Sequence, residues 1–209
     1  MDSKGKTGKG ARRRVEKPSV LEGLKSVEAD SVLRRLLKAH PDLRGEAERI
    51  ARSLLHEQEF EDVAAEVEEE VQALDYDDLN GRAGKHKGGY IEPTEAALEL
   101  LEEAVEPFIS DLKRHIDLGL EGEALEICKG VVLGLYRVRD GQGGDVLGWA
   151  PDFPAEEASH AVSVWYRGRD DPGTPAGARR RKRPPFPKDF LGMVPEWTDI
   201  ITRASSGKS

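Results

Sequence analysis

Residues 92–138 decide the fold, and they read EPTEAALELLEEAVEPFISDLKRHIDLGLEGEALEICKGVVLGLYRV. Apolar residues recur here at steps of three and four, which predicts two helices that each carry one apolar stripe. Pro93 suits the first turn of the first helix, where a backbone N–H has no helical acceptor. The stripes comprise Leu98, Leu101, Val105, Phe108, Ile109, Leu112 and Ile116, then Ala124, Leu125, Cys128, Val131, Val132, Leu135 and Tyr136.

Proline and glycine residues interrupt these two helices, which together form a helical hairpin. Pro107 should kink the first helix or split it, because proline lacks the N–H donor and crowds the preceding turn. Gly119 and Gly122 should separate the two helices. Gly130 and Gly134 lie one turn apart, so we expect another backbone to approach closely there; the alternative is that each only weakens the helix by about 1 kcal/mol. The hairpin has more apolar surface than it covers, so further helices should pack on it.

The preceding residues predict three more helices, after a short one at Leu21–Leu24. The first has Asp30 or Ser31 as its N-cap, a buried stripe of Val32, Leu33, Leu36 and Leu37, and its end at His40-Pro41. The next begins at Pro41 and runs through Leu43, Ala47, Ile50, Ala51, Leu54 and Leu55. The last of the three carries Phe60, Val63, Ala64, Val67, Val71 and Leu74. Short links favour antiparallel neighbours.

Two segments around residue 80 are candidate protein-binding surfaces. Residues 57–78 hold eleven acidic residues and no Lys or Arg. This indicates either a solvated helix face or a patch that binds a basic partner or one of this chain's own basic tails. Residues 80–91 form a Gly-rich loop that either receives an anion or makes a turn that lays its tyrosine on the core. The candidate protein-binding residues are Glu66, Glu69, Glu70, Lys85, His86, Lys87 and Tyr90.

After a flexible turn at 139–145, Trp149 and Phe153 should hold the next helix, about 154–166, onto the body. Residues 170–187 are rich in proline, glycine and arginine and read as a linker or basic tail. Residues 191–201 predict a short amphipathic helix that either returns to the body or docks elsewhere. No alternating strand pattern occurs. We therefore expect an all-α protein, a short α-solenoid or a bundle of antiparallel helix pairs.

The expected organisation is a disordered basic arm at 1–18, a helical domain at 19–167, and at 168–209 a linker with a short amphipathic segment. A net charge of −8 and 34% charged residues indicate a soluble chain. No apolar run reaches the length of a membrane span, and the basic N-terminus lacks the apolar segment of a secretory signal. A single cysteine, Cys128, excludes an intramolecular disulfide. We expect a cytoplasmic location and no membrane partner.

The residues that bear chemistry form no recognised catalytic pattern. Glu157 and His160 have a metal-binding spacing, and Asp111 and His115 share a helix face, but a two-metal bundle needs more ligands. Cys128 lies among apolar residues and reads as a small buried hydrophobe. The sequence contains no Gly-x-Ser-x-Gly elbow. We therefore predict neither an enzyme nor a cofactor or metal site.

Five short segments carry a resemblance to a known family: 39–44 (AHPDLR), 88–94 (GGYIEPT), 103–108 (EAVEPF), 134–137 (GLYR) and 149–154 (WAPDFP). With them, residues 32–165 resemble the α-helical region of bacterial proteins that carry a SWIM zinc finger, and of related uncharacterised helical-repeat proteins. The resemblance implies helix pairs stacked as a short solenoid and brings no established activity. The Cys and His ligands of the finger itself are absent, since the chain has one cysteine.

Two functions fit these observations. The first is a non-catalytic helical scaffold that binds a protein partner of unknown identity, because stacked helix pairs offer extended surfaces. The alternative is a nucleic-acid-associated adaptor that contacts phosphates through two basic clusters. These clusters comprise Arg12, Arg13, Arg14, Arg179, Arg180, Arg181, Lys182 and Arg183. They lack interleaved aromatic residues, so base stacking has no evident platform.

Overall fold

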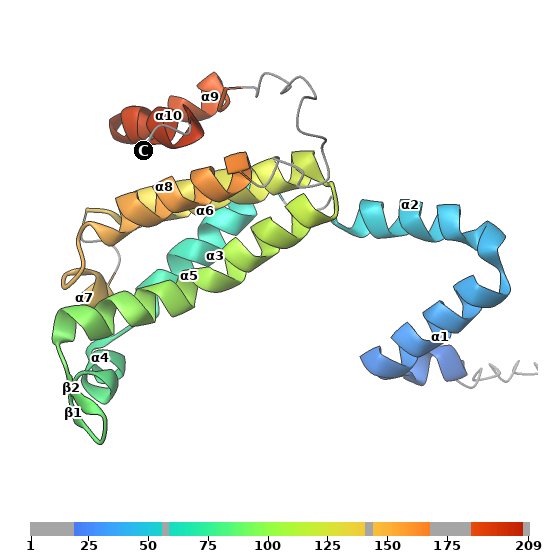
Figure 1. The fold of residues 1–209 in the computed structure, drawn as a ribbon, viewed down its shortest axis with the longest axis horizontal. Coiled ribbons are helices and arrows are strands. Elements are labelled where there is room, and N and C mark those ends of the chain that lie inside the picture. The colour runs from blue at the N-terminus through green and yellow to red at the C-terminus, as the bar shows by residue number, and fades with distance from the viewer. Residues whose placement is uncertain (1–18, 56–58, 141–143, 168–184, 207–209) are drawn as a thin grey trace, which may run out of the picture. The chain divides into compact units, whose positions relative to one another are not determined.

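The computed structural model describes residues 19–55, 59–140, 144–167 and 185–206 (Figure 1). Its internal contacts divide the chain into two compact units: unit 1 extends to Leu54, and unit 2 begins at Leu55. The sequence analysis expects one helical domain over 19–167, whereas these contacts separate the first helices from the rest. They also group the helices after residue 185 with unit 2.

Unit 1 consists of two α-helices joined by a single 3₁₀ turn. Its elements are η1 (Val20–Gly23), α1 (Ser26–Ala39), η2 (Pro41–Leu43) and α2 (Arg44–Leu55). The prediction that α1 starts after Asp30 or Ser31 is wrong. The helix begins one turn earlier, because the Glu28 carboxylate accepts a hydrogen bond from the backbone N–H of Lys25 at 2.9 Å and satisfies a donor at the helix start. The predicted end at His40-Pro41 is confirmed.

Unit 2 contains helices from α3 onward and one small hairpin. Its elements are α3 (Phe60–Gln72), α4 (Tyr76–Arg82), β1 (Gly84–His86), β2 (Gly89–Ile91), α5 (Pro93–Asp117), α6 (Glu121–Val138), α7 (Gly144–Leu147), α8 (Phe153–Arg167), α9 (Lys188–Leu191), η3 (Pro195–Trp197) and α10 (Thr198–Ser206). Over the described residues the chain is mostly helical, which confirms the all-α prediction. Helix α6 packs against α3, α5 and α8, and most of its residues are buried.

The close approach predicted at Gly130 and Gly134 occurs between α6 and α3. A Cβ atom placed on Gly134 would lie 2.7 Å from the carbonyl oxygen of Ala64 and 2.8 Å from the Cβ of Val67. At Gly130 the same atom would lie 2.6 Å from Val63 Cγ1. No side chain fits at these distances, so the two glycines let the α3 backbone pack directly on α6.

Helix α5 begins at Pro93, as predicted, and continues unbroken to Asp117 through Pro107. The helix is therefore not split. Its buried face differs from the prediction at one turn, because Leu98 is exposed while Ala97 and Leu100 are buried. Most of the other predicted stripe positions, including Leu101 and Ile109, are buried.

The hairpin of β1 and β2 contradicts the prediction that the chain has no strand. Gly84 pairs with Ile91 and His86 with Gly89 in an antiparallel register. Gly84 and Gly89 have positive φ angles of 101° and 143°, which glycine adopts without strain. Gly89 directly follows the turn at residues 87–88, and Gly84 begins the first strand. Such short strands need no run of β-branched residues, so the sequence gives them little signal.

The C-terminal segment returns to the body, which decides between the two predicted alternatives. Helix α10 packs on α8. Five apolar side chains of the C-terminal segment are buried: Phe186, Phe190, Val194, Trp197 and Ile201. The rings of Phe190 and Phe60 lie edge to face at 6.0 Å, and those of Trp197 and Tyr136 at 5.1 Å. Aromatic pairs of this geometry add to the free energy gained by burial alone.

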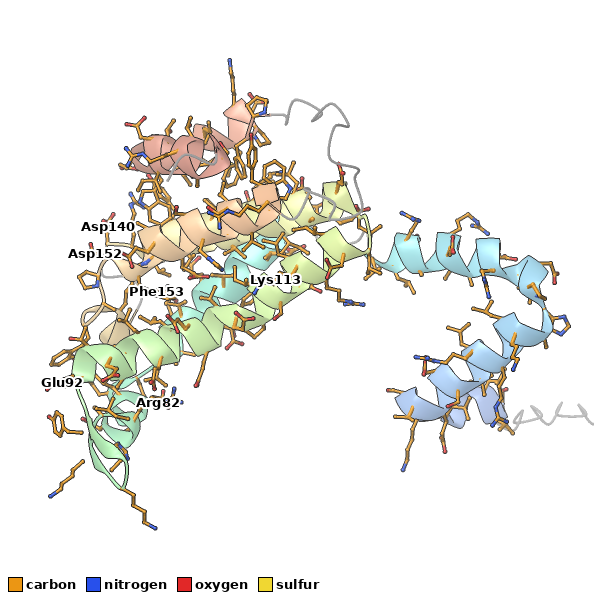
Figure 2. All side chains as sticks on the ribbon, in the orientation of Figure 1. Arg82, Glu92, Lys113, Asp140, Asp152 and Phe153 are labelled. Atoms are coloured by element: carbon orange, nitrogen blue, oxygen red, sulfur yellow. The ribbon has the colours of Figure 1, made fainter. Side chains whose placement is uncertain are left out.

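The prediction that Trp149 and Phe153 both hold α8 onto the body is confirmed only for Phe153. Phe153, at the first position of α8, is buried, but Trp149 is 44% exposed (Figure 2). Among the helices that the structure describes, none is both long and apolar enough to cross a bilayer.

Candidate functional site

The clearest surface feature of the described residues is an apolar stripe along the two helices of unit 1. The α1–α2 stripe is defined here by five exposed side chains: Val32, Leu33, Leu36, Ile50 and Leu54. Val32, Leu33 and Leu36 expose 41%, 47% and 44% of their surfaces. The prediction that these three are buried is therefore wrong, although the helical spacing behind it is correct.

Between Ser19 and Leu55, all of which the structure describes, no side chain is buried. Five apolar residues in this range are half-buried: Leu24, Leu37, Leu43, Ala47 and Leu55. Leu43 belongs to η2, which packs on α1. The rest of both stripes faces outward. Single exposed leucines are ordinary, but several exposed apolar side chains at helical spacing, such as Val32, Leu33 and Leu36 on α1, are typical of an interaction surface.

Charged side chains beside the stripe are ordered by sign along α1. The first half of the helix holds Glu28 and Asp30, and the second half holds Arg34, Arg35 and Lys38. Asp30 and Arg34 form an exposed ion pair at 2.8 Å within the helix. Exposed pairs of this kind contribute little to stability. The arrangement leaves the two ends of α1 with opposite charge.

A second feature is a hollow of about 530 Å³ between α4, the hairpin and α5. Arg82 lies at its edge (Figure 2) and donates two hydrogen bonds to the Glu103 carboxylate at 2.7 and 2.8 Å. These bonds raise the pKa of Arg82 and lower that of Glu103. His86 Nε2 donates to the carbonyl oxygen of Arg82 at 2.6 Å. The hollow is lined by Asp77, Asp78, Gly81, Arg82, His86, Ile91, Glu99 and Leu100.

The predicted loop residues lie on this hairpin and are exposed, although His86 also lines the hollow and donates to Arg82. Lys85, His86 and Lys87 are exposed, and Tyr90 is 62% exposed. The alternative in which the turn lays Tyr90 on the core is therefore wrong. Lys85 and Tyr90 face each other across the strand pair, so the hairpin displays one basic and one aromatic group together.

The predicted acidic residues Glu66, Glu69 and Glu70 are exposed on α3. Two other carboxylates of this helix have structural partners instead: Glu61 lies 2.7 Å and Glu68 3.9 Å from the Arg137 guanidinium on α6. The structure thus places the three candidate residues on a solvated face of α3, whereas the other four candidates lie on the hairpin. Both predicted basic clusters, residues 12–14 and 179–183, lie outside the described residues.

Outside the hollow, Cys128 and His115 are two chemically reactive side chains that lie in the core. Burial raises the pKa of the Cys128 thiol, which disfavours the reactive thiolate and confirms its place as a core side chain. His115 is buried and donates through Nδ1 to the Asp111 carbonyl oxygen at 2.8 Å, while its Nε2 has no hydrogen-bond partner there. No set of three metal-ligating side chains lies together in the part of the chain that the structure describes.

Glu157 lies at the packing seam of α8 and α5. Burial raises the pKa of its carboxyl group, and the nearby carboxylates of Glu102 and Glu106 raise it further. His160 and Lys113 act in the opposite direction. Glu157 and His160 are therefore electrostatic neighbours, as their predicted spacing implies.

Comparison of the chain with family models, curated proteins and solved structures finds no match in any of the three. The resemblance to the helical region of SWIM zinc-finger proteins accordingly stays a prediction. The fold and its surfaces define the molecule only as a mostly helical protein with an exposed apolar stripe.

Proposed function

We propose that this chain is a non-catalytic helical scaffold whose partner is a protein that binds the α1–α2 stripe. The observation that carries the proposal is the exposure of Val32, Leu33 and Leu36 on a helix that buries no residue of its own. Covering such side chains removes apolar surface from water, which is the main favourable term in protein association.

Unit 2 supports the proposal by contrast. Its helices cover one another around α6, so it has the core of an independent body. Unit 1 does not cover its own apolar surface, which fits a segment that is completed by binding. The stacking of helix pairs as a solenoid stays a prediction that would give this scaffold further surface.

The test compares three full-length proteins as bait in chemical cross-linking from a native extract. The first is the natural chain, and the second carries Leu33→Glu and Leu36→Glu on the stripe. The third carries Leu118→Glu, the same change at an exposed leucine of unit 2. We expect the first and third to yield the same cross-linked protein and the second to lose it at least tenfold.

Each cross-linked protein is then purified and mixed with the bait to measure the dissociation constant. Recovery that is equal for all three baits, or a purified partner that binds the stripe variant as tightly as the natural chain, would contradict the proposal. Circular dichroism of the stripe variant must first show an unchanged helix content, because a glutamate on an exposed face should not disturb the helix.

A nucleic-acid role is the second candidate, and the division of charge between the two units favours it. Residues 1–54 hold 14 Lys and Arg against 8 Asp and Glu, while residues 55–209 hold 18 against 32. A basic segment on an acidic chain is suited to phosphate contacts. If this role is correct, binding to mixed-sequence DNA or RNA will weaken steeply with salt. Replacing Arg12–Arg14 and Arg179–Arg183 by glutamine will then abolish it; unchanged binding would exclude these clusters.

A further inference from the structure

We propose that two copies of this chain pair through α1 in antiparallel orientation, so that the first partner of the stripe is the stripe of a second copy. This inference rests on the proposed function, because it uses the same surface and names its occupant. It is carried by the order of apolar and charged residues along α1.

Four apolar residues of α1, namely Ala29, Val32, Leu33 and Leu36, are arranged symmetrically about the midpoint between Val32 and Leu33. Ala29 precedes this midpoint by the same number of residues as Leu36 follows it. When two such helices run in opposite directions, Ala29 of each copy lies opposite Leu36 of the other, and Val32 opposite Leu33. Small side chains then face large ones, which lets two helices pack closely.

Charge selects the antiparallel orientation over the parallel one. A parallel pair would place Glu28 beside Glu28 and Arg35 beside Arg35, and like charges at this distance repel. An antiparallel pair places the acidic half of α1, with Glu28 and Asp30, beside the basic half with Arg34, Arg35 and Lys38. Arg35 and Lys38 have no ion-pair partner among the described residues, so they are available to the second copy.

The same balance of charge argues for a second copy over an unrelated partner. Helix α1 holds two acidic and three basic residues, so its net charge is small. A strongly acidic or strongly basic partner would be attracted by one half of α1 and repelled by the other half. A helix with the reversed order of signs meets two favourable halves, and α1 itself, turned end to end, has that order.

The experiment is sedimentation equilibrium of the full chain over a roughly hundredfold range of concentration, since dimer formation follows mass action. We expect a reversible monomer–dimer equilibrium for the natural chain and for Leu118→Glu. The combined variant Leu33→Glu and Leu36→Glu should raise the dissociation constant at least tenfold. A dimer that the combined variant leaves unchanged would overturn the inference.

Orientation is tested by cross-linking through introduced cysteines. Ser26 and Ala39 are equally distant from the midpoint of α1, so an antiparallel pair brings Ser26 of one copy to Ala39 of the other. A mixture of Ser26→Cys and Ala39→Cys chains should form a disulfide-linked heterodimer faster than either variant alone forms a homodimer. The native Cys128 is buried and does not compete. Faster homodimer formation would indicate a parallel pair and overturn the inference.

The outcomes separate this inference from the proposed function. A chain that is monomeric throughout but binds another purified protein through Leu33 and Leu36 would overturn self-pairing and leave the scaffold proposal standing. A monomeric chain in which hydrogen exchange shows α1 protected, and in which no partner depends on the stripe, would overturn both, because its own residues would then cover the stripe.

Discussion

Units 1 and 2 are built from the same kind of amphipathic helix, yet only unit 2 covers its apolar faces. In unit 2, α3, α5 and α8 surround α6, and its side chains such as Leu135 are fully buried. In unit 1, Leu33 occupies an equivalent place on an apolar stripe and stays half exposed. The difference shows that helical periodicity specifies a face, while the surrounding helices decide whether that face becomes a core or a surface for binding.

The sharpest test of this comparison replaces one leucine in each unit by alanine. Leu135→Ala should lower the free energy of unfolding by about 2–5 kcal/mol, because it leaves a cavity in a closed core. Leu33→Ala should change it by less than about 0.5 kcal/mol in dilute solution, where an exposed side chain loses little. Urea unfolding followed by tryptophan fluorescence measures both, since Trp149, Trp165 and Trp197 all lie in unit 2.

Circular dichroism in the same titration reports on both units together and serves as the control for unit 1. If Leu33→Ala costs as much as Leu135→Ala by fluorescence, the stripe must be buried against unit 2. The contrast between the two units would then be wrong.

A smaller effect is expected from the contact of α6 with α3. Gly134→Ala should destabilise unit 2 by about 1–3 kcal/mol, because the added methyl group overlaps the carbonyl oxygen of Ala64 and the side chain of Val67. Gly122→Ala is the matched control in the same helix. A Cβ there meets nothing within 4 Å, so the change should be neutral or stabilise by up to about 1 kcal/mol. Equal effects at both positions in thermal unfolding would contradict close packing.

The smallest effect concerns Glu157, whose pKa is raised mainly by burial. A carboxyl group with a raised pKa in the folded state stabilises that state while protonated, and the contribution is lost as pH rises through the folded-state pKa. Glu157→Gln should therefore become more stable relative to the natural chain as pH rises from about 4 to about 7. Because the group is partly exposed, we expect a gain below about 1 kcal/mol.

Urea unfolding at several pH values measures this gain, with Glu156→Gln as the control at an exposed neighbour on α8. A difference that is constant with pH, or that reverses in sign, would show that Glu157 is not penalised by its place at the seam of α5 and α8.

Much of unit 2 follows from its sequence. Spacing and backbone chemistry predict four of its features correctly. These are the start of α5 at Pro93, the break at Gly119, the close approach at Gly130 and Gly134, and the core position of Cys128. These features are local or depend on one neighbouring helix. They need no knowledge of which distant segments meet.

The errors arise where the answer depends on a partner. Val32, Leu33 and Leu36 have the spacing of core residues, and only the absence of a covering helix among the described residues makes them a surface. Leu98 and Leu100 both suit the stripe of α5, and packing on α4 and α6 chooses between them. The hairpin at Gly84–Ile91 depends on two glycine φ angles instead of a strand pattern. The sequence therefore predicts the apolar face of α1 but not that this face is exposed.

The aromatic contact between Phe60 and Phe190 has a consequence for synthesis of the protein. The two rings come from the first and one of the last helices of unit 2, so Phe60 leaves the ribosome long before the ring that shields it. Until then Phe60, over which Lys129 of α6 also lies, lacks its partner Phe190, and Trp165 lacks its partner Phe186. Chaperones bind uncovered aromatic surface, and we expect their engagement to end only once α9 has been translated.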